Sequence, residues 1–153
     1  MNNVLVAVDS SKGSEACVAV CARLFAGRPQ TTVTLVHVMQ YGGPAAGDDL
    51  TSDAELSELR ETLEGSPQLE ALTAKAEAMI ATHRKVLEEH GFRDLRTVIK
   101  TGRPADEILR AAAENKAELI IIGNTRSLIN KLLMGDVARK VAHAATVPVL
   151  LAR

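Results

Sequence analysis

Residues 4–11, VLVAVDSS, place five consecutive apolar residues directly before a polar cluster. An apolar run of this length, rich in β-branched side chains, predicts a strand that is buried on both faces. Asp9, Ser10 and Ser11 then supply the turn-forming and helix-capping residues that are typical of a strand followed by a helix. The stretch therefore predicts the first unit of an α/β fold.

The same succession of strand and helix continues to the end of the chain. A first helix with its apolar stripe at Ala16, Val20 and Leu24 is expected to end at Gly27. Further strands are predicted at 32–39, 95–100, 119–122 and 147–151. Further helices are predicted from a stripe of Leu69, Leu72, Ala76, Met79, Ile80, His83 and Leu87 that ends at Gly91, from Pro104 at a first helical position, and over 136–144.

This alternation implies an open parallel five-stranded sheet with helices on both faces, joined by right-handed crossovers. We expect a single domain over residues 1–153, without internal repeats. Pro148 has no backbone N–H to give to a ladder, so the last strand is expected at an edge of the sheet. Residues 41–66 break the pattern with glycines and acidic side chains, and we interpret them as a long loop, disordered or adaptable rather than functional.

The composition narrows the classes of function. A net charge of −1 and an aromatic content of 2% provide neither the basic surface nor the stacking rings that nucleic-acid binding uses. No apolar run approaches the roughly 20 residues of a membrane span. The N-terminus lacks the cationic flank and apolar core of a secretory signal. We therefore expect a cytoplasmic protein with neither a nucleic-acid nor a membrane partner.

The two cysteines, Cys17 and Cys21, lie four residues apart on the first predicted helix. A disulfide across this spacing would be strained, and two thiols without further ligands make a poor zinc site. We predict buried thiols that behave as small apolar side chains, with a redox or metal role as the alternative.

Open parallel sheets bind ligands beyond the carboxyl ends of their strands, where the winding reverses. Asp9 and Gly123 follow two such ends, but no P-loop, G-x-G-x-x-G fingerprint or G-x-S-x-G nucleophile elbow surrounds them. The acid that a phosphate-accepting receiver domain would carry after its third strand is also missing. We therefore predict no catalytic residue and no resident metal. His37, His83 and His143 are interpreted as packing or helix-end residues.

Residues 123–137, GNTRSLINKLLMGDV, form a candidate phosphate site. Gly123 at a strand end and Gly135 before a predicted helix would let backbone N–H groups approach a phosphate at a helix N-terminus. Arg126 and Lys131 could add full charges. Alternatively, Gly123 only eases a sharp turn and Gly135 only separates two helical segments. The spacing alone leaves both interpretations open.

Four segments together resemble the universal stress protein family. They are residues 4–16 (VLVAVDSSKGSEA), residues 35–38 (LVHV), residues 102–108 (GRPADEI) and the C-terminal stretch 120–153, which begins IIIGNTRS. The resemblance implies a sheet of order 3-2-1-4-5, similar to the adenine nucleotide alpha hydrolases. It also implies a homodimer formed through the strand at 147–151.

Nucleotide-binding members of this family share the pattern G-x-x-G-x9-G-[ST]. The matching positions here are Gly123, Arg126, Gly135 and Asp136, followed by Val137. Arg126 replaces the second glycine, the stretch is one residue short, and Asp136 replaces the hydroxyl that would meet the terminal phosphate. A carboxylate about 4 Å from a phosphate oxygen costs about 1 kcal/mol in water and about 4 kcal/mol at a partly shielded site. Asp136 is equally explained as a helix N-cap.

The adenine end matches the family more closely. Asp9 corresponds to the acid near the ribose and base, Val38 to the position whose backbone reads adenine, and Ile122 precedes the phosphate turn. We expect a dimeric stress-response module that binds AMP or ATP weakly or not at all, with Mg²⁺ only alongside ATP. The alternatives are a genuine ATP-binding switch and an enzyme, either a slow ATPase or a transferase. The His-x-x-His or H-I-G-H signature of the transferases is absent.

Overall fold

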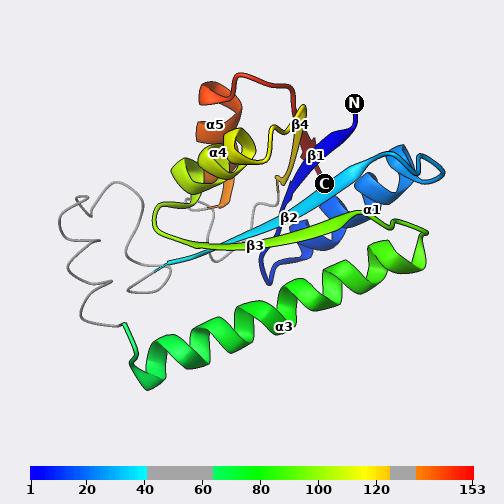
Figure 1. Ribbon diagram of the computed structural model, residues 1–153. Helices are drawn as coiled ribbons and strands as arrows, with labels where there is room; N and C mark the ends of the chain where they lie inside the picture. The colour runs from blue at the N-terminus through cyan, green and yellow to red at the C-terminus, as the bar shows by residue number, and fades with distance from the viewer. Residues whose placement is uncertain (41–63, 125–133) are drawn as a thin grey trace.

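The computed structural model describes residues 1–40, 64–124 and 134–153 (Figure 1). Strands and helices alternate in the predicted order. The elements are β1 (Asn3–Ala7), α1 (Lys12–Phe25), β2 (Thr32–Met39), α3 (Pro67–Glu89), β3 (Leu95–Thr101), α4 (Pro104–Glu114), β4 (Leu119–Gly123), α5 (Met134–Ala144) and β5 (Val149–Ala152). The predicted acidic loop falls, up to residue 63, outside the described residues.

The five strands are parallel and follow the order β3-β2-β1-β4-β5, which confirms the predicted sheet. In the central strand β1, Val6 pairs with Leu35 of β2 on one side and with Ile121 of β4 on the other. The chain therefore winds outward from β1 to β3 and returns to the other side of β1 for β4. β5 is an edge strand, as predicted. It spans Val149–Ala152 rather than 147–151, so Pro148 lies directly before the strand and not within it.

Figure 1 shows α4 and α5 on one face of the sheet and α1 and α3 on the other. The side chains of β1 alternate between two cores. Val4 and Val6 join the core that includes α1 and α3, whereas Leu5 and Ala7 join the core that includes α4 and α5. Burial on both faces explains why the first strand is apolar throughout.

Two leucines that we predicted to be buried face solvent. Leu24 of α1 is 47% exposed and Leu72 of α3 is 45% exposed. The buried residues of α1 are Gly13, Ser14, Cys17, Val18, Cys21, Ala22 and Phe25, and those of α3 are Ala76, Ile80, His83 and Leu87. Helical spacing identifies a possible apolar face, but it does not decide which of two neighbouring faces meets the sheet.

Cys17 and Cys21 are buried and free of disulfides, as predicted. The pKa of each thiol rises from 9.0 to about 12, mainly because of burial and, for Cys17, also because of the nearby charge of Asp9. Thiols with such pKa values stay protonated at neutral pH, so both side chains serve as small apolar residues of the core.

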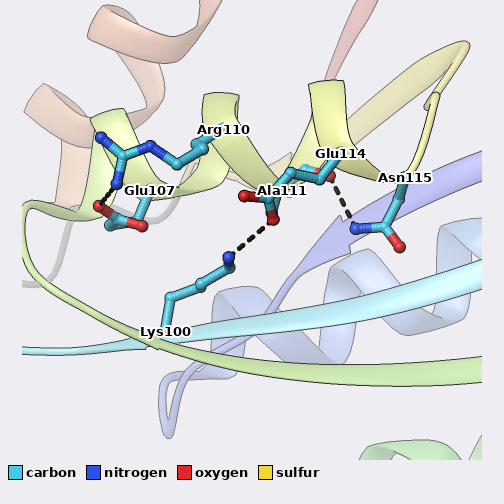
Figure 2. Close-up of polar contacts among 6 residues, drawn as sticks. All are labelled: Lys100, Glu107, Arg110, Ala111, Glu114 and Asn115. Atoms are coloured by element: carbon cyan, nitrogen blue, oxygen red, sulfur yellow. Dashed lines mark hydrogen bonds and ion pairs between the residues drawn. The ribbon is translucent and has the colours of Figure 1, made fainter.

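Polar contacts connect α4 with the edge strand β3 (Figure 2). Lys100 Nζ of β3 lies 2.7 Å from Glu114 Oε2 of α4. Within α4, Glu107 pairs with Arg110 on the next turn of the helix. Gly102 forms the corner before α4 with a φ of +144°, and an added Cβ there would lie 3.2 Å from Glu107 Cγ. The N–H of Gly102 donates to the last carbonyl of β2, so this corner supports the carboxyl end of that strand.

Candidate functional site

The carboxyl ends of β2, β1 and β4 lie side by side, because these strands are parallel neighbours. The winding reverses between β1 and β4, which is where open α/β sheets bind ligands. Val38 lies near the end of β2, Asp9 follows β1, and Ile122 and Gly123 end β4. The fold therefore brings these four predicted residues to one edge of the sheet.

The first turn of α1 orients the carboxylate of Asp9. Asp9 Oδ1 accepts hydrogen bonds of 2.8 Å from both the Ser11 N–H and the Ser14 hydroxyl. The Asp9 N–H in turn donates to Ser14 Oγ at 2.6 Å. Ser14 is buried, at 3% exposed, and the sequence did not reveal it as a partner of Asp9. These bonds fix the direction of a half-buried carboxylate at the reversal point.

Two histidines contact the backbone of the same loop. His37 Nδ1 lies 2.8 Å from the carbonyl oxygen of Val8, and His83 Nε2 lies 3.4 Å from that of Asp9. Both side chains are packed, as predicted, but they also meet consecutive carbonyls at the end of β1. His143 is exposed in the last turn of α5, in keeping with the predicted helix-end position.

Gly123 has a structural reason to lack a side chain. A Cβ at this position would lie 3.1 Å from the Cα, C and O atoms of Gly13, in the first turn of α1. Packing of α1 against the end of β4 therefore requires glycine, with or without a ligand. This packing is a different structural reason from the sharp turn that the sequence suggested, and Gly123 has no positive φ that would need glycine. A phosphate role for Gly123 stays a prediction.

The side chains of Val38 and Ile122 belong to the core beside α4 and α5. Ile122 is 5% exposed, and Val38 is half-buried and pairs with Lys100 of β3. Contacts from Val38 and Ile122 to a ligand at the edge would therefore come mainly from their backbone groups.

The predicted phosphate segment is only partly described. Arg126 and Lys131 lie outside the described residues. Gly135 is the second residue of α5 rather than a residue before the helix, and Asp136 is the third. The prediction that Asp136 caps the helix is therefore wrong, because α5 begins two residues earlier, at Met134.

The carboxylate of Asp136 pairs with Arg139 on the next turn of α5. This partner was not predicted from the sequence, although the three-residue spacing is one at which helical side chains meet. Val137, the remaining predicted residue, is half-buried and packs against the core beside α4. The negative charge of Asp136 is thus partly offset within its own helix.

Two hollows in the described part of the chain lie between helices rather than at the strand edge. One hollow, of about 360 Å³, is lined by residues of α1 and α3. The other, of about 420 Å³, is lined by residues of α4 and α5. Neither is lined by Asp9, Val38, Ile122 or Gly123. We place the candidate site at the carboxyl ends of β2, β1 and β4, because the winding reverses there and the oriented carboxylate of Asp9 lies there.

The described part of the chain contains neither a metal-binding cluster nor a membrane-spanning helix. Within residues 1–40, 64–124 and 134–153, no group of three His, Cys, Asp or Glu side chains is placed to hold a metal ion. Over those residues, no helix is long and apolar enough to cross a membrane.

The sequence is similar to known proteins over its whole length. The model of the universal stress protein family matches residues 1–153. A universal stress protein of Thermus aquaticus is 31% identical over 98% of this chain and 97% of its own length. A universal stress protein of Methanothermobacter thermautotrophicus is 41% identical over 58 residues, and one of Methanocaldococcus jannaschii is 34% identical over 93 residues. The latter two matches cover 38% and 59% of this chain, and 40% and 54% of those proteins.

Solved structures share the fold. The hypothetical protein MJ0577 matches 99% of this chain and 94% of its own, with a TM-score of 0.76 and 22% identity. A universal stress protein in complex with cAMP has a TM-score of 0.68 at 19% identity, with 99% of this chain and 96% of that chain covered. The universal stress protein from Archaeoglobus fulgidus in complex with dAMP has a TM-score of 0.63 at 22% identity, with 100% and 98% covered.

Proposed function

We propose that the chain, which belongs to the universal stress protein family, is a stress-response module. It binds an adenine nucleotide beyond the carboxyl ends of β2, β1 and β4. The observation that carries the proposal is the carboxylate of Asp9, oriented by Ser11 and Ser14 at the reversal point of the sheet. A pre-oriented carboxylate is suited to accept hydrogen bonds from the hydroxyl groups of a ribose.

The adenine base would contact backbone groups rather than side chains. The backbone of Val38, near the end of β2, lies one strand away from Asp9, and we propose that this backbone contacts the base, as the family resemblance implies. Relatives of the same fold have been solved with cAMP and dAMP, both of which are adenine nucleotides. These complexes support an adenine ligand, and we extend that ligand class to this chain.

We propose that the phosphate groups of the nucleotide contribute little to its binding. Asp136 stands where the family pattern has a hydroxyl residue, and its charge opposes a terminal phosphate. The pairing with Arg139 reduces that repulsion without supplying an attraction. We therefore propose that AMP and ATP bind with similar affinity, with Mg²⁺ only alongside ATP, and that Gly123, Arg126 and Gly135 add little. An ATP-binding switch is the competing function, and the Asp136–Arg139 pair is the observation that favours it.

A thermal-shift comparison of AMP with GMP tests the adenine site. We expect AMP to raise the unfolding temperature and GMP to leave it unchanged. The variant Asp9→Asn should weaken AMP binding about 10- to 100-fold, since a hydrogen bond to a charged group contributes about 1.5–3 kcal/mol. Asp94→Asn, at the amino end of β3, is the control and should bind AMP as the wild type does. Equal shifts with AMP and GMP would contradict the proposal.

We further propose that the protein is a homodimer formed through residues 147–151. β5 is an edge strand, and Leu151 on it is 45% exposed. Exposed strand edges with apolar side chains favour pairing with another copy. Light scattering at micromolar concentration should give a dimer for the wild type and a monomer for Leu151→Lys. Leu72→Lys changes an equally exposed leucine on α3 and should stay dimeric. A monomeric wild type would rule out this assembly.

The proposed ligand and the two free thiols are both suited to the cytoplasm. We propose that the module acts in the cytoplasm, where adenine nucleotides are available and free thiols such as Cys17 and Cys21 stay reduced.

A further inference from the structure

The backbone leaves the sheet immediately after β1. Ala7 is the last residue of β1 in the ladder with β2, and the N–H of Val8 still donates to Val36 O at 2.9 Å. The next two carbonyls meet side chains instead. Val8 O lies 2.8 Å from His37 Nδ1, and Asp9 O lies 3.4 Å from His83 Nε2. Consecutive carbonyls of one loop thus contact imidazoles from two different elements, β2 and α3.

The chemistry of the partners defines how the hydrogen bonds run. A carbonyl oxygen only accepts, so the ring nitrogen in each contact must carry the hydrogen. His37 therefore donates from Nδ1 to Val8, at the length of a normal hydrogen bond. His83 donates from Nε2 to Asp9 over a longer distance, which makes it the weaker of the two contacts.

These bonds act on the residue that carries the proposed site. Ser11 and Ser14 orient the carboxylate of Asp9, whereas His37 and His83 hold the backbone on which that carboxylate is mounted. Neither imidazole can be replaced by an apolar side chain of similar volume without removing the donor from a packed carbonyl.

We propose that His37 and His83 are positioning residues, which fix the loop between β1 and α1 so that Asp9 presents its carboxylate to an adenine nucleotide. His37 is the stronger of the two. The inference rests on the proposed nucleotide site for its functional part, while the constraint on the loop itself requires no ligand. His37 also precedes Val38, so one residue connects the loop with the strand end whose backbone would contact the base.

Matched variants separate a hydrogen-bond donor from simple packing. Asn places an amide nitrogen near the position of Nδ1, and Gln places one near Nε2, whereas Leu fills similar space without a donor. The full-length variants His37→Leu, His37→Asn, His83→Leu and His83→Gln should be compared with the wild type. Amide hydrogen exchange of residues 9–14 in ligand-free protein reports the loop, and the amides of β4 report global opening.

We expect both Leu variants to accelerate exchange in residues 9–14 relative to β4, more strongly for His37. Their affinity for AMP, measured by calorimetry, should fall about 2- to 10-fold, the range for one neutral hydrogen bond. The Asn and Gln variants should restore both the exchange rates and the affinity. Unchanged exchange in His37→Leu, or equal losses in His37→Leu and His37→Asn, would overturn the inference. A wild type that binds no AMP would overturn the proposed function alone, since the exchange measurement still decides whether the histidines hold the loop.

Discussion

The backbone of Gly13 in α1 occupies the space into which a side chain on Gly123 would extend. A Cβ at Gly123 would lie 3.1 Å from the Cα, C and O atoms of Gly13, a separation that real Cβ atoms rarely show. The N-terminus of α1 therefore packs directly on the last residue of β4. This contact joins the loop that carries Asp9 to the strand on the other side of the winding reversal.

Gly123→Ala is expected to destabilise the protein, because the backbone of Gly13 would have to move. Extra methyl groups in packed positions cost about 1–3 kcal/mol, which denaturant unfolding would detect. AMP affinity should fall as well, since the same movement shifts the start of α1, to which the carboxylate of Asp9 is hydrogen-bonded. Gly91→Ala is the matched control. Gly91 has a φ of +87° with no atom near an added Cβ, so the variant should lose stability but keep its AMP affinity. A fully stable Gly123→Ala protein would refute the packing argument.

Asp136→Ser should strengthen the binding of ATP and leave the binding of AMP unchanged. Removing a carboxylate about 4 Å from a phosphate gains about 1 kcal/mol in water and about 4 kcal/mol at a partly shielded site, so the affinity for ATP should rise at least about fivefold. Asp106→Ser is the control, because Asp106 is likewise the third residue of its helix, α4. Calorimetry with both nucleotides measures the difference. Equal changes for ATP and AMP would show that Asp136 does not face the phosphates.

Cys17 and Cys21 should resist alkylation in the folded protein. A pKa of about 12 instead of 9.0 leaves about 1000-fold less thiolate near pH 8, and both thiols are also shielded by packing. Iodoacetamide labelling, followed by mass spectrometry, should therefore require unfolding and be complete in denaturant. Rapid labelling of either thiol without a change in circular dichroism would contradict the packing of α1 on the sheet.

Glu118 should make stability depend on pH. Hydrogen bonds from the N–H groups of Asn2 and Asn3 lower the pKa of this carboxyl below its usual 4.5. A pKa that is lower in the folded state contributes stability above the unfolded pKa, and the contribution is lost as the pH falls through the folded value. Glu118→Gln should thus unfold at lower temperature than the wild type near pH 7, and the gap should close in acid. Glu77→Gln, on an exposed position of α3, should match the wild type throughout.

The parallel sheet and the edge position of β5 could be predicted because their signals are local, whereas the strand order came from the family resemblance. The apolar run from Val4 to Val8 indicates burial on both faces, and Pro148 beside the last strand favoured an edge position. The buried face of α1 was less predictable, since Leu24 and Phe25 fit neighbouring faces of the same helix and only packing against the sheet decides between them.

The candidate site was predictable in position but not in its supporting contacts. Asp9 and Gly123 could be identified because they lie at the ends of apolar runs. Arg139 could have been identified, since it lies one turn beyond Asp136. His83 contacts Asp9 across 74 residues of sequence, and such a distant pairing leaves no local pattern.

The proposed site is tested most directly by calorimetric titration of the wild-type protein with AMP and with ATP in the presence of Mg²⁺. An intact adenine side with a weak phosphate side predicts that both nucleotides bind, with dissociation constants within about fivefold of each other. The absence of binding by either nucleotide at millimolar concentration would contradict the adenine site. Binding of ATP with Mg²⁺ more than about 100-fold tighter than AMP would contradict the weak phosphate side and establish the ATP-binding switch instead.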